Sequence, residues 1–217
     1  MTDKKISLKA IKIGLLGDST VGKTAICNSL LGLEFNQDML STIGSDKLET
    51  KFPLKNGNEI KLILWDTAGQ ERFRSVALKA IKAVQGIVLV FDVTKKSSFD
   101  NIGSWIEDIK ENLQNPCLIL FGNKIDLGKE KWQVSTEEAK AYAEKMKLPY
   151  YETSAKTKQG IQEGFSYIVN ETYEKVEGKI DDNIDLGKKP TKEKSGCFGK
   201  KKNKNTNEDN KKKGKEK

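Results

Sequence analysis

A glycine-rich stretch, GDSTVGKT (residues 17–24), is the feature that most constrains the fold of this chain. It matches the pattern GxxxxGK[ST] and follows the apolar run from Lys9 to Leu16, which is typical of a strand. A loop of this kind works between a strand and a helix, because its backbone N–H groups and the first helical turn surround a phosphate group. In that setting Lys23 contacts β- and γ-phosphates, and the hydroxyl of Thr24 is a ligand of Mg²⁺. The motif therefore predicts a strand–loop–helix unit that binds a nucleotide.

Further apolar runs indicate the other strands of a sheet. They occupy residues 47–54, 59–65, 86–93, 117–121 and the short stretch 150–153. The run GIVLVFDV (residues 86–93) is apolar except for Asp92, and such runs are typical of parallel strands covered on both faces. Residues 55–58 separate the first two runs, and their Asn56-Gly57 pair predicts a hairpin turn in which both residues have positive φ.

Amphipathic segments between these runs predict helices. One segment has apolar residues at the spacing of a single helix face, namely Phe99, Ile102, Ile106, Ile109 and Leu113. Ser135 and Glu138 form a capping box that opens the next helix, and a last helix carries Ile161, Phe165 and Ile168. The alternation predicts a doubly wound α/β sheet, and the phosphate-binding loop before its first helix is typical of the P-loop NTPase class. We expect a six-stranded, mostly parallel sheet with one antiparallel hairpin strand and helices on both faces. Ligands of such sheets bind beyond the carboxyl ends of the strands.

Composition excludes several function classes. The chain has no histidine, so a mechanism that needs an imidazole base or an imidazole–metal site is ruled out. Cys27, Cys117 and Cys197 are far apart and odd in number, which argues against a disulfide framework or zinc site and suits a reducing compartment. The sequence has no run of about 18 apolar residues and no secretory signal pattern, so we expect neither a transmembrane helix nor secretion.

The net charge of +8 resides at the C-terminal end of the chain. Residues 188–217 contain 13 lysines and four acidic residues, whereas residues 1–187 carry 26 basic and 27 acidic side chains. The nearly neutral body argues against a nucleic-acid-binding domain, and no nucleic-acid partner is expected. Because Phe198 is the one large apolar residue of the basic segment, we expect that segment to be disordered.

A second motif, WDTAGQE (residues 65–71), ends one of the apolar strands with a carboxylate. Asp66 is placed to hold the hydration shell of Mg²⁺, and Gly69 can bring its backbone N–H close to a γ-phosphate. Gln70 is placed to orient an attacking water molecule. These residues predict phosphoryl transfer to water.

Two tetrapeptides after later strands predict the base. In NKID (residues 123–126), the Asp126 carboxylate can accept hydrogen bonds from N1 and the exocyclic N2 of guanine. Adenine lacks this pair of donors, so the buried acceptor would reject it. In TSAK (residues 153–156), the backbone N–H of Ala155 can meet the base O6. The order of the four motifs therefore predicts guanine specificity.

Over about residues 9–177 the chain resembles the Ras superfamily of small GTPases, and most closely the Rab family. The resemblance rests on the four motifs above, on KLILWDTAGQERFRS (residues 61–75), on VLVFDVT (residues 88–94) and on Thr42-Ile43-Gly44. It implies that Thr42, 19 residues after Lys23, is the first-switch threonine that binds Mg²⁺ and senses the γ-phosphate. It also implies that Phe35 stacks on the guanine.

The resemblance and the motifs together define the expected site and domains. The catalytic residues are Gln70, Lys23 and Thr42, and the Mg²⁺ ligands are Thr24, Thr42 and, through water, Asp66. Nucleotide-binding residues are Gly17, Asp18, Ser19, Thr20, Val21, Gly22, Lys23, Thr24, Ala25, Phe35, Gly69, Asn123, Lys124, Asp126, Ser154, Ala155 and Lys156. The expected domains are an N-terminal extension (1–8), a small GTPase domain (9–177) and a Lys-rich, disordered hypervariable tail (178–217).

The chain departs from the Rab pattern at its effector-binding positions. Rab effectors commonly contact three aromatic residues across the two switches, and the matching positions here are Lys47, Trp65 and Ala80. We therefore expect generic Rab effectors to bind poorly, and a divergent partner to use Lys47, Lys79 and Lys82.

The tail departs from the Rab pattern as well. Cys197 lies 20 residues before Lys217, so neither a C-terminal CaaX box nor a terminal prenylated cysteine is present. One interpretation is that Cys197 carries a lipid while the lysines attract an anionic membrane. Another is a nuclear-targeting or merely solubilising segment.

The sequence therefore predicts a Rab-like switch in vesicle-mediated transport, which binds GTP and GDP with Mg²⁺ and hydrolyses GTP slowly. Expected partners are an exchange factor, a GTPase-activating protein that supplies an arginine, and effectors. The expected location is cytoplasmic, peripheral on the cytosolic face of an intracellular membrane. The alternatives are a nuclear-transport or other Ras-superfamily signalling GTPase, and a GTP-binding scaffold that does not hydrolyse.

Overall fold

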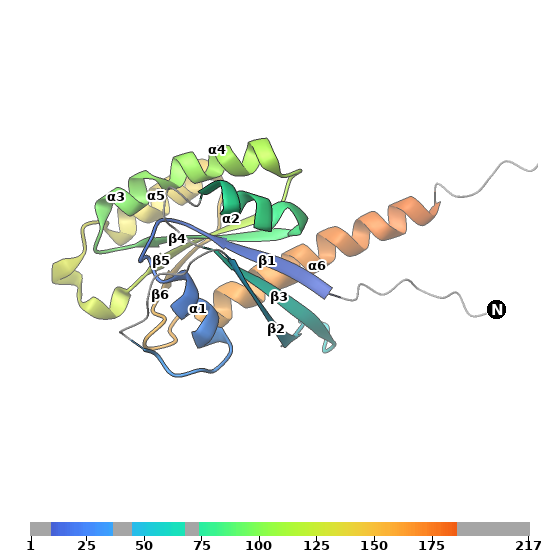
Figure 1. The fold of residues 1–217 in the computed structure, drawn as a ribbon, viewed down its shortest axis with the longest axis horizontal. Helices are drawn as coiled ribbons and strands as arrows, with labels where there is room; N and C mark the ends of the chain where they lie inside the picture. Colours follow the sequence, from blue (N-terminus) through green and yellow to red (C-terminus); the bar gives the residue numbers. More distant parts are fainter. Residues whose placement is uncertain (1–9, 37–44, 68–73, 186–217) are drawn as a thin grey trace, which may run out of the picture.

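The computed structural model describes residues 10–36, 45–67 and 74–185 (Figure 1). Its strands are β1 (Ala10–Leu16), β2 (Ser45–Pro53), β3 (Glu59–Thr67), β4 (Gly86–Asp92), β5 (Cys117–Asn123) and β6 (Tyr150–Thr153). Its α-helices are α1 (Lys23–Leu30), α2 (Arg74–Ala80), α3 (Lys96–Asp100), α4 (Ile102–Asn112), α5 (Thr136–Met146) and α6 (Ile161–Asp185). Short 3₁₀ turns are η2 (Ile81–Ala83), η3 (Ile125–Leu127) and η4 (Lys129–Lys131).

The strands form one sheet of six strands in the order β2-β3-β1-β4-β5-β6. β2 pairs with β3 in antiparallel orientation, and every other pair is parallel. Apolar runs such as β4, which is buried along its whole length, can only lie in the centre of a sheet that helices cover on both faces. The predicted fold class is confirmed.

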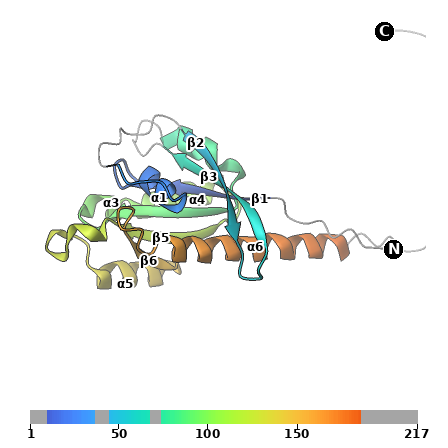
Figure 2. The same cartoon turned by 90° about the horizontal axis from the view of Figure 1, so that it is seen from below.

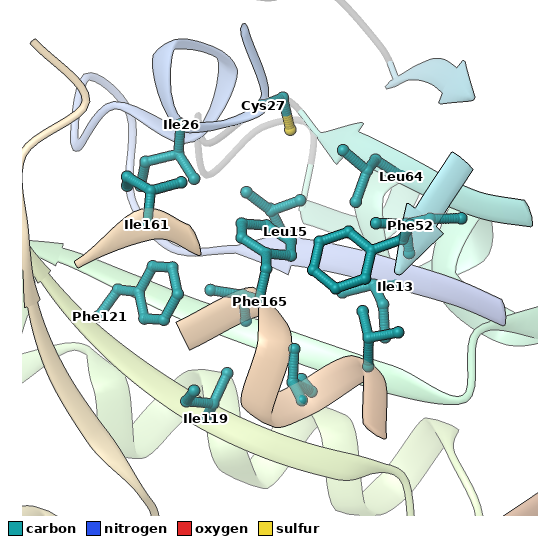
Figure 3. Close-up of a cluster of buried hydrophobic side chains, with 14 of the residues drawn as sticks. Ile13, Leu15, Ile26, Cys27, Phe52, Leu64, Ile119, Phe121, Ile161 and Phe165 are labelled. Carbon is teal, nitrogen blue, oxygen red and sulfur yellow. The ribbon is translucent and has the colours of Figure 1, made fainter. Parts of the chain in front are cut away.

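Each face of the sheet has its own hydrophobic core. On one face α1 and α6 pack against the strands, with Ile26, Leu15 and Phe165 fully buried between them (Figure 3). On the other face α2, α3, α4 and α5 cover residues such as Leu89 and Phe91. In Figure 1, α3 and α4 lie above the strands and α1 lies below them. The two layers hold the carboxyl ends of the parallel strands in one row.

The hairpin between β2 and β3 differs from the prediction. Gly57 has φ 82°, but Asn56 does not have positive φ. The N–H of Gly57 donates to the carbonyl of Leu54 over 3.0 Å, and the N–H of Leu54 donates to Asn58 over 2.8 Å. This pattern fits a type I turn followed by a glycine bulge, in which one left-handed residue is sufficient. The tip reaches α6, where the N–H of Lys55 donates to Asn170 over 2.9 Å (Figure 2).

The helices between residues 96 and 146 differ from the prediction in two details. The single expected apolar stripe is divided between α3 and α4, which meet at Asn101. At α5, the backbone N–H of Glu138 donates to the hydroxyl of Ser135 over 3.1 Å, as a capping box requires. The Glu138 side chain, however, pairs with Lys96, because α3 brings an ammonium group beside it.

Helix α6 continues to Asp185, so the expected domain boundary at residue 178 falls inside a helix. The sequence after residue 170 supplies the reason. It lacks proline up to residue 189 and is rich in Glu and Lys, including the i,i+4 pair of Glu171 and Lys175. In the described ranges, no helix is both long and apolar enough to cross a bilayer.

Candidate nucleotide site

The loop between β1 and α1 has backbone geometry that two of its glycines require. Gly17 has φ 145°, and a Cβ there would lie 2.1 Å from the carbonyl oxygen of Val90. Gly22 has φ 101°, and a Cβ there would lie 2.4 Å from Nδ2 of Asn123. Thr20 also has positive φ (65°), an uncommon conformation for a β-branched residue. The loop is therefore held in a specific shape by neighbouring strands.

Helix α1 begins with features that suit an anion. Gly22 occupies the N-cap without a side-chain hydrogen bond, and the first turn has no acidic residue. The first N–H groups of a helix carry partial positive charge, so they attract a phosphate when no side chain neutralises them. Thr24 and Ala25 lie in this first turn, and Ser19 and Thr20 lie in the loop that leads to it.

Lys23 lies under the loop with only 5% of its surface exposed. Its Nζ donates to the carbonyl of Gly17 over 2.8 Å and to that of Asp18 over 2.7 Å. Burial lowers the pKa of Lys23 from 10.5 to about 8, and the carboxylates of Asp66 and Asp18 oppose that shift. The ammonium group is thus positioned inside the curve of the loop, where phosphate charge would favour its protonated form.

The candidate Mg²⁺ ligands from two elements are in contact. The hydroxyl of Thr24 donates to Oδ2 of Asp66, at the end of β3, over 2.6 Å, and Asp66 is fully buried. Hydroxyl and carboxylate oxygens are the hard ligands that Mg²⁺ prefers, and this cation usually retains several waters and phosphate oxygens. The donor set therefore fits Mg²⁺ bound together with a nucleotide.

Asn123 connects the phosphate loop to the two loops that are expected to bind the base. Its Nδ2 donates to the carbonyl of Val21 over 2.8 Å, and its Oδ1 accepts from the N–H of Ala155 over 3.2 Å. Thr153 donates to the same Oδ1 over 3.4 Å. Asn123 is 1% exposed, so these bonds are shielded from water.

The other base-contacting residues are also held by partners. Ser154 donates to Oδ1 of Asp126 over 2.6 Å, which leaves Oδ2 of Asp126 for a ligand. Lys124 has φ 72°, and its Nζ lies 2.7 Å from Oδ2 of Asp92. Asp92 ends β4, is 5% exposed and also accepts from Thr94. Sequence reasoning did not assign Asp92 to the site, although a lone carboxylate in an apolar strand was an available signal.

The expected site residues also omit two residues that contact the loop, one just before α4 and one within it. Nδ2 of Asn101 donates to Oδ2 of Asp18 over 2.7 Å, and Nε1 of Trp105 donates to Oδ1 of Asp18 over 3.0 Å. No local pattern indicated these contacts, since Trp105 looks like an ordinary apolar residue beside the helix stripe.

Two expected site residues are exposed, and others lie outside the described residues. Phe35 lies after α1 with 42% of its surface exposed, and Lys156 is exposed next to Ala155. The remaining expected site residues lie outside the described residues, namely Thr42, Gly69, Gln70 and the lipidation candidate Cys197.

The three effector-matching positions lie on one side of the molecule. Lys47 and Trp65 are register partners on β2 and β3, and α2, which ends at Ala80, contacts both strands. Nζ of Lys47 lies 2.5 Å from a carboxylate oxygen of Glu49, which also pairs with Lys61. These two ion pairs lower the pKa of Glu49 to about 2.

Comparison with known proteins agrees with this geometry. The Ras family model matches residues 12–174. The chain is 38% identical to the GTP-binding protein ypt3 of Schizosaccharomyces pombe over 181 residues, which are 83% of this chain and 84% of the relative. It is 38% identical to human Ras-related protein Rab-8B, over 81% of this chain and 84% of the relative. Identity to Ras-related protein Rab11A of Lotus japonicus is also 38%, over 77% and 74%.

Proposed function

Because the chain belongs to the Ras family and is a Rab-like small GTPase, we propose that residues 17–24 hold the phosphates of GTP and that Asn123, Asp126 and Ala155 bind its guanine base. The family assignment makes the chain a GTP-binding protein and a GTP hydrolase that takes part in vesicle traffic. The residues that perform each step are the proposal.

The phosphate-binding step uses backbone groups and one side chain. The N–H groups of the loop and the first turn of α1 donate to phosphate oxygens, and Lys23 moves from the carbonyls of Gly17 and Asp18 to the β- and γ-phosphates. Ras-family proteins generally bind Mg²⁺ with the nucleotide, and here Thr24, Asp66 and Thr42 would hold it. When bound, that ion would supply positive charge that neutralises the phosphates.

The hydrolysis step is proposed to be slow in the isolated chain. Gln70 orients the attacking water, and Thr42 donates to the γ-phosphate side of the site. The sequence contains two arginines, Arg72 and Arg74, and the second is bound to α4 through Asp108 and Ser104. With Arg74 so engaged, an activating protein supplies the arginine, which accelerates related enzymes by on the order of 10³–10⁵-fold.

Hydrolysis converts the chain from one binding state to another. We assign its partners to three kinds: an exchange factor that removes GDP, an activating protein and an effector that contacts the GTP state. The effector is proposed to differ from generic Rab effectors, because Lys47 and Ala80 stand where aromatic residues are expected beside Trp65.

The Lys-rich tail is proposed to hold the protein on the cytosolic face of an intracellular membrane. Thirteen lysines in residues 188–217 attract anionic lipid, and Cys197 among them is the candidate for acylation. Fusing residues 186–217 to a fluorescent protein tests this. Membrane staining that is lost on Cys197→Ser supports it, whereas nuclear accumulation supports the nuclear-transport alternative.

The nucleotide proposal depends above all on the two hydrogen bonds of Asn123, because this one buried amide joins the phosphate loop to the loop that contains Ala155. Calorimetry of the purified chain with GDP, a non-hydrolysable GTP analogue and ADP, each with Mg²⁺, tests it. We expect heat with both guanine nucleotides and none with ADP. Equal binding of ADP and GDP, or no binding of either, would overturn the proposal.

Hydrolysis has its own test in single-turnover assays of the chain loaded with GTP. The wild type should release phosphate slowly, and Gln70→Leu should be slower by about tenfold or more, since positioned groups of this kind contribute ~10²-fold or more. If the two proteins are equally inactive, the chain is the non-hydrolysing scaffold instead.

A further inference from the structure

Asp18 is a carboxylate in a loop that is built to bind phosphate. A carboxylate that faced the phosphates would repel them, and in a water-poor site the repulsion would be strong. In this structure the side chain points away, because Nδ2 of Asn101 donates to Oδ2 over 2.7 Å and Nε1 of Trp105 donates to Oδ1 over 3.0 Å. Two donors, Asn101 just before α4 and Trp105 within it, therefore keep the negative charge of Asp18 outside the loop.

The same residue also holds the lysine of the site. The carbonyl of Asp18 accepts from Nζ of Lys23 over 2.7 Å. Its side chain and its backbone carbonyl are thus bound by α4 and by Lys23 respectively. The contact with α4 and the contact with Lys23 therefore meet on one residue.

Trp105 reaches a third element through its ring. The guanidinium carbon of Arg74 lies 4.1 Å from the centre of the Trp105 ring, and Arg74 also pairs with Asp108 and donates to Ser104 over 2.8 Å. Arg74 is the first residue of α2, which begins three residues after the end of the WDTAGQE motif. Trp105 is therefore in contact with α2 on one side and with the phosphate loop on the other.

Packing alone explains only part of this arrangement. Trp105 is 2% exposed and belongs to the core between α4 and the sheet, so a large apolar ring is needed there. Phenylalanine would also fill that part of the core. Filling the core explains neither the N–H of Trp105 directed at Asp18 nor the guanidinium of Arg74 over the ring. A cation stacked on an aromatic ring and a hydrogen bond to a carboxylate each contribute a measurable free energy to holding these groups together.

We propose that Asp18 and Trp105 are positioning residues that keep the phosphate loop in its binding shape and connect it to α2, so that a displacement of Arg74 accelerates nucleotide release. This inference rests on the proposed nucleotide site. By linkage, the connection acts in both directions, so a nucleotide that changes the loop also changes the position of α2.

Release of a fluorescent GDP analogue from the full chain, with Mg²⁺ present, tests the proposal. Trp105→Phe keeps an aromatic ring and removes the N–H, so the Asp18 carboxylate is held by Asn101 alone and turns toward the phosphates more easily. We expect release to accelerate about 5- to 30-fold, as for loss of one charge-assisted hydrogen bond. Lys110→Ala changes an exposed residue of the same helix and should release at the wild-type rate.

A rescue variant separates positioning from packing. Asp18→Asn keeps a carbonyl acceptor and removes the charge, so adding it to Trp105→Phe should slow release again, to within about threefold of the wild type. A defect of packing in the α4 core would not respond to a charge at Asp18. If Trp105→Phe releases at the wild-type rate, or if Asp18→Asn makes the double variant faster still, the proposal is wrong.

The connection to α2 has a spectroscopic readout. The indole N–H resonance of Trp105, identified by its loss in Trp105→Phe, should shift in Arg74→Lys and when GDP is exchanged for a non-hydrolysable GTP analogue. An unchanged resonance in both cases would exclude the connection. Failure of the wild type to bind GDP would contradict the proposed function, whereas normal binding with unaffected variants would contradict only this inference.

Discussion

The hydroxyl of Thr24 donates a hydrogen bond to Oδ2 of Asp66 across 2.6 Å, although the two residues belong to different elements and lie 42 positions apart. The contact brings the N-terminus of α1 against the end of β3. A cation bound at this point would be held by the oxygens of Thr24 and Asp66, in place of the hydrogen bond between them.

Removal of Mg²⁺ should therefore weaken nucleotide binding, and Thr24 should account for much of the effect. In the wild type, chelation with EDTA should raise the rate of GDP release by about tenfold or more, equivalent to ~1.4 kcal/mol. In Thr24→Ala, release should already be fast and should respond to EDTA by less than about twofold. Thr24→Ser keeps the hydroxyl and is the matched control. Equal sensitivity of Thr24→Ala and wild type to EDTA would contradict the assignment.

Replacing Asn123 should disrupt both halves of the site. Asn123→Ala leaves the carbonyl of Val21 and the N–H of Ala155 without their buried partner, at about 1–3 kcal/mol each. We expect the affinity for GDP to fall about 10²-fold, as measured by calorimetry. Asn112→Ala removes a comparable amide from an exposed position at the end of α4 and should leave the affinity unchanged. A shift of less than threefold in Asn123→Ala would show that the link is dispensable.

The hydrogen-bonding character of Asp126 should determine the base. Asp126→Asn replaces an acceptor with a group that both donates and accepts, which suits xanthine because its 2-position carries an oxygen. Affinity for GDP should fall by about 10²-fold or more, and affinity for xanthosine diphosphate should exceed it. Competition between the two nucleotides in one assay measures the ratio. If GDP remains preferred, the base contact lies elsewhere.

The effector surface should accept generic Rab effectors once its aromatic residues are restored. In Lys47→Phe with Ala80→Tyr, two rings join Trp65 next to α2, and aromatic anchors often contribute more than 1 kcal/mol each. We expect the affinity of the GTP-analogue-loaded protein for a Rab effector domain to rise about tenfold or more in a biosensor assay. Lys51→Phe lies on the same strand and should produce no gain. No increase in the double variant would mean that other residues set partner choice.

Two phenylalanines should separate stability from binding. Phe165 is fully buried against Phe121, with ring centres 5.8 Å apart, so Phe165→Ala should lower the free energy of unfolding by about 3–5 kcal/mol. Phe35 is 42% exposed, so Phe35→Ala should cost less than ~1 kcal/mol in the nucleotide-free protein but should weaken GDP binding. Urea unfolding and calorimetry on both variants measure the contrast. A large loss of stability in Phe35→Ala would place its ring in the core.

Most elements of the fold could be predicted because their signals are local. The apolar run of β4 and the glycine loop before α1 each lie within about ten consecutive residues, and the structure confirms both elements. The turn at Asn56-Gly57 could not be typed from its sequence, because one pair of residues is compatible with more than one turn. The end of the last helix had no local signal in the sequence, and the structure extends α6 to Asp185, past the domain boundary expected at residue 178.

The sequence by itself determined which chemical groups follow each strand, since a motif and the strand before it are neighbours along the chain. Tertiary structure alone decided how those groups are oriented. Asp18 is turned out of the phosphate loop by Asn101 and Trp105, which lie 83 and 87 positions away in the sequence. Lys124 is likewise directed by Asp92, at the end of the neighbouring strand. Such contacts exist only when packing brings distant segments together, and no short pattern encodes them.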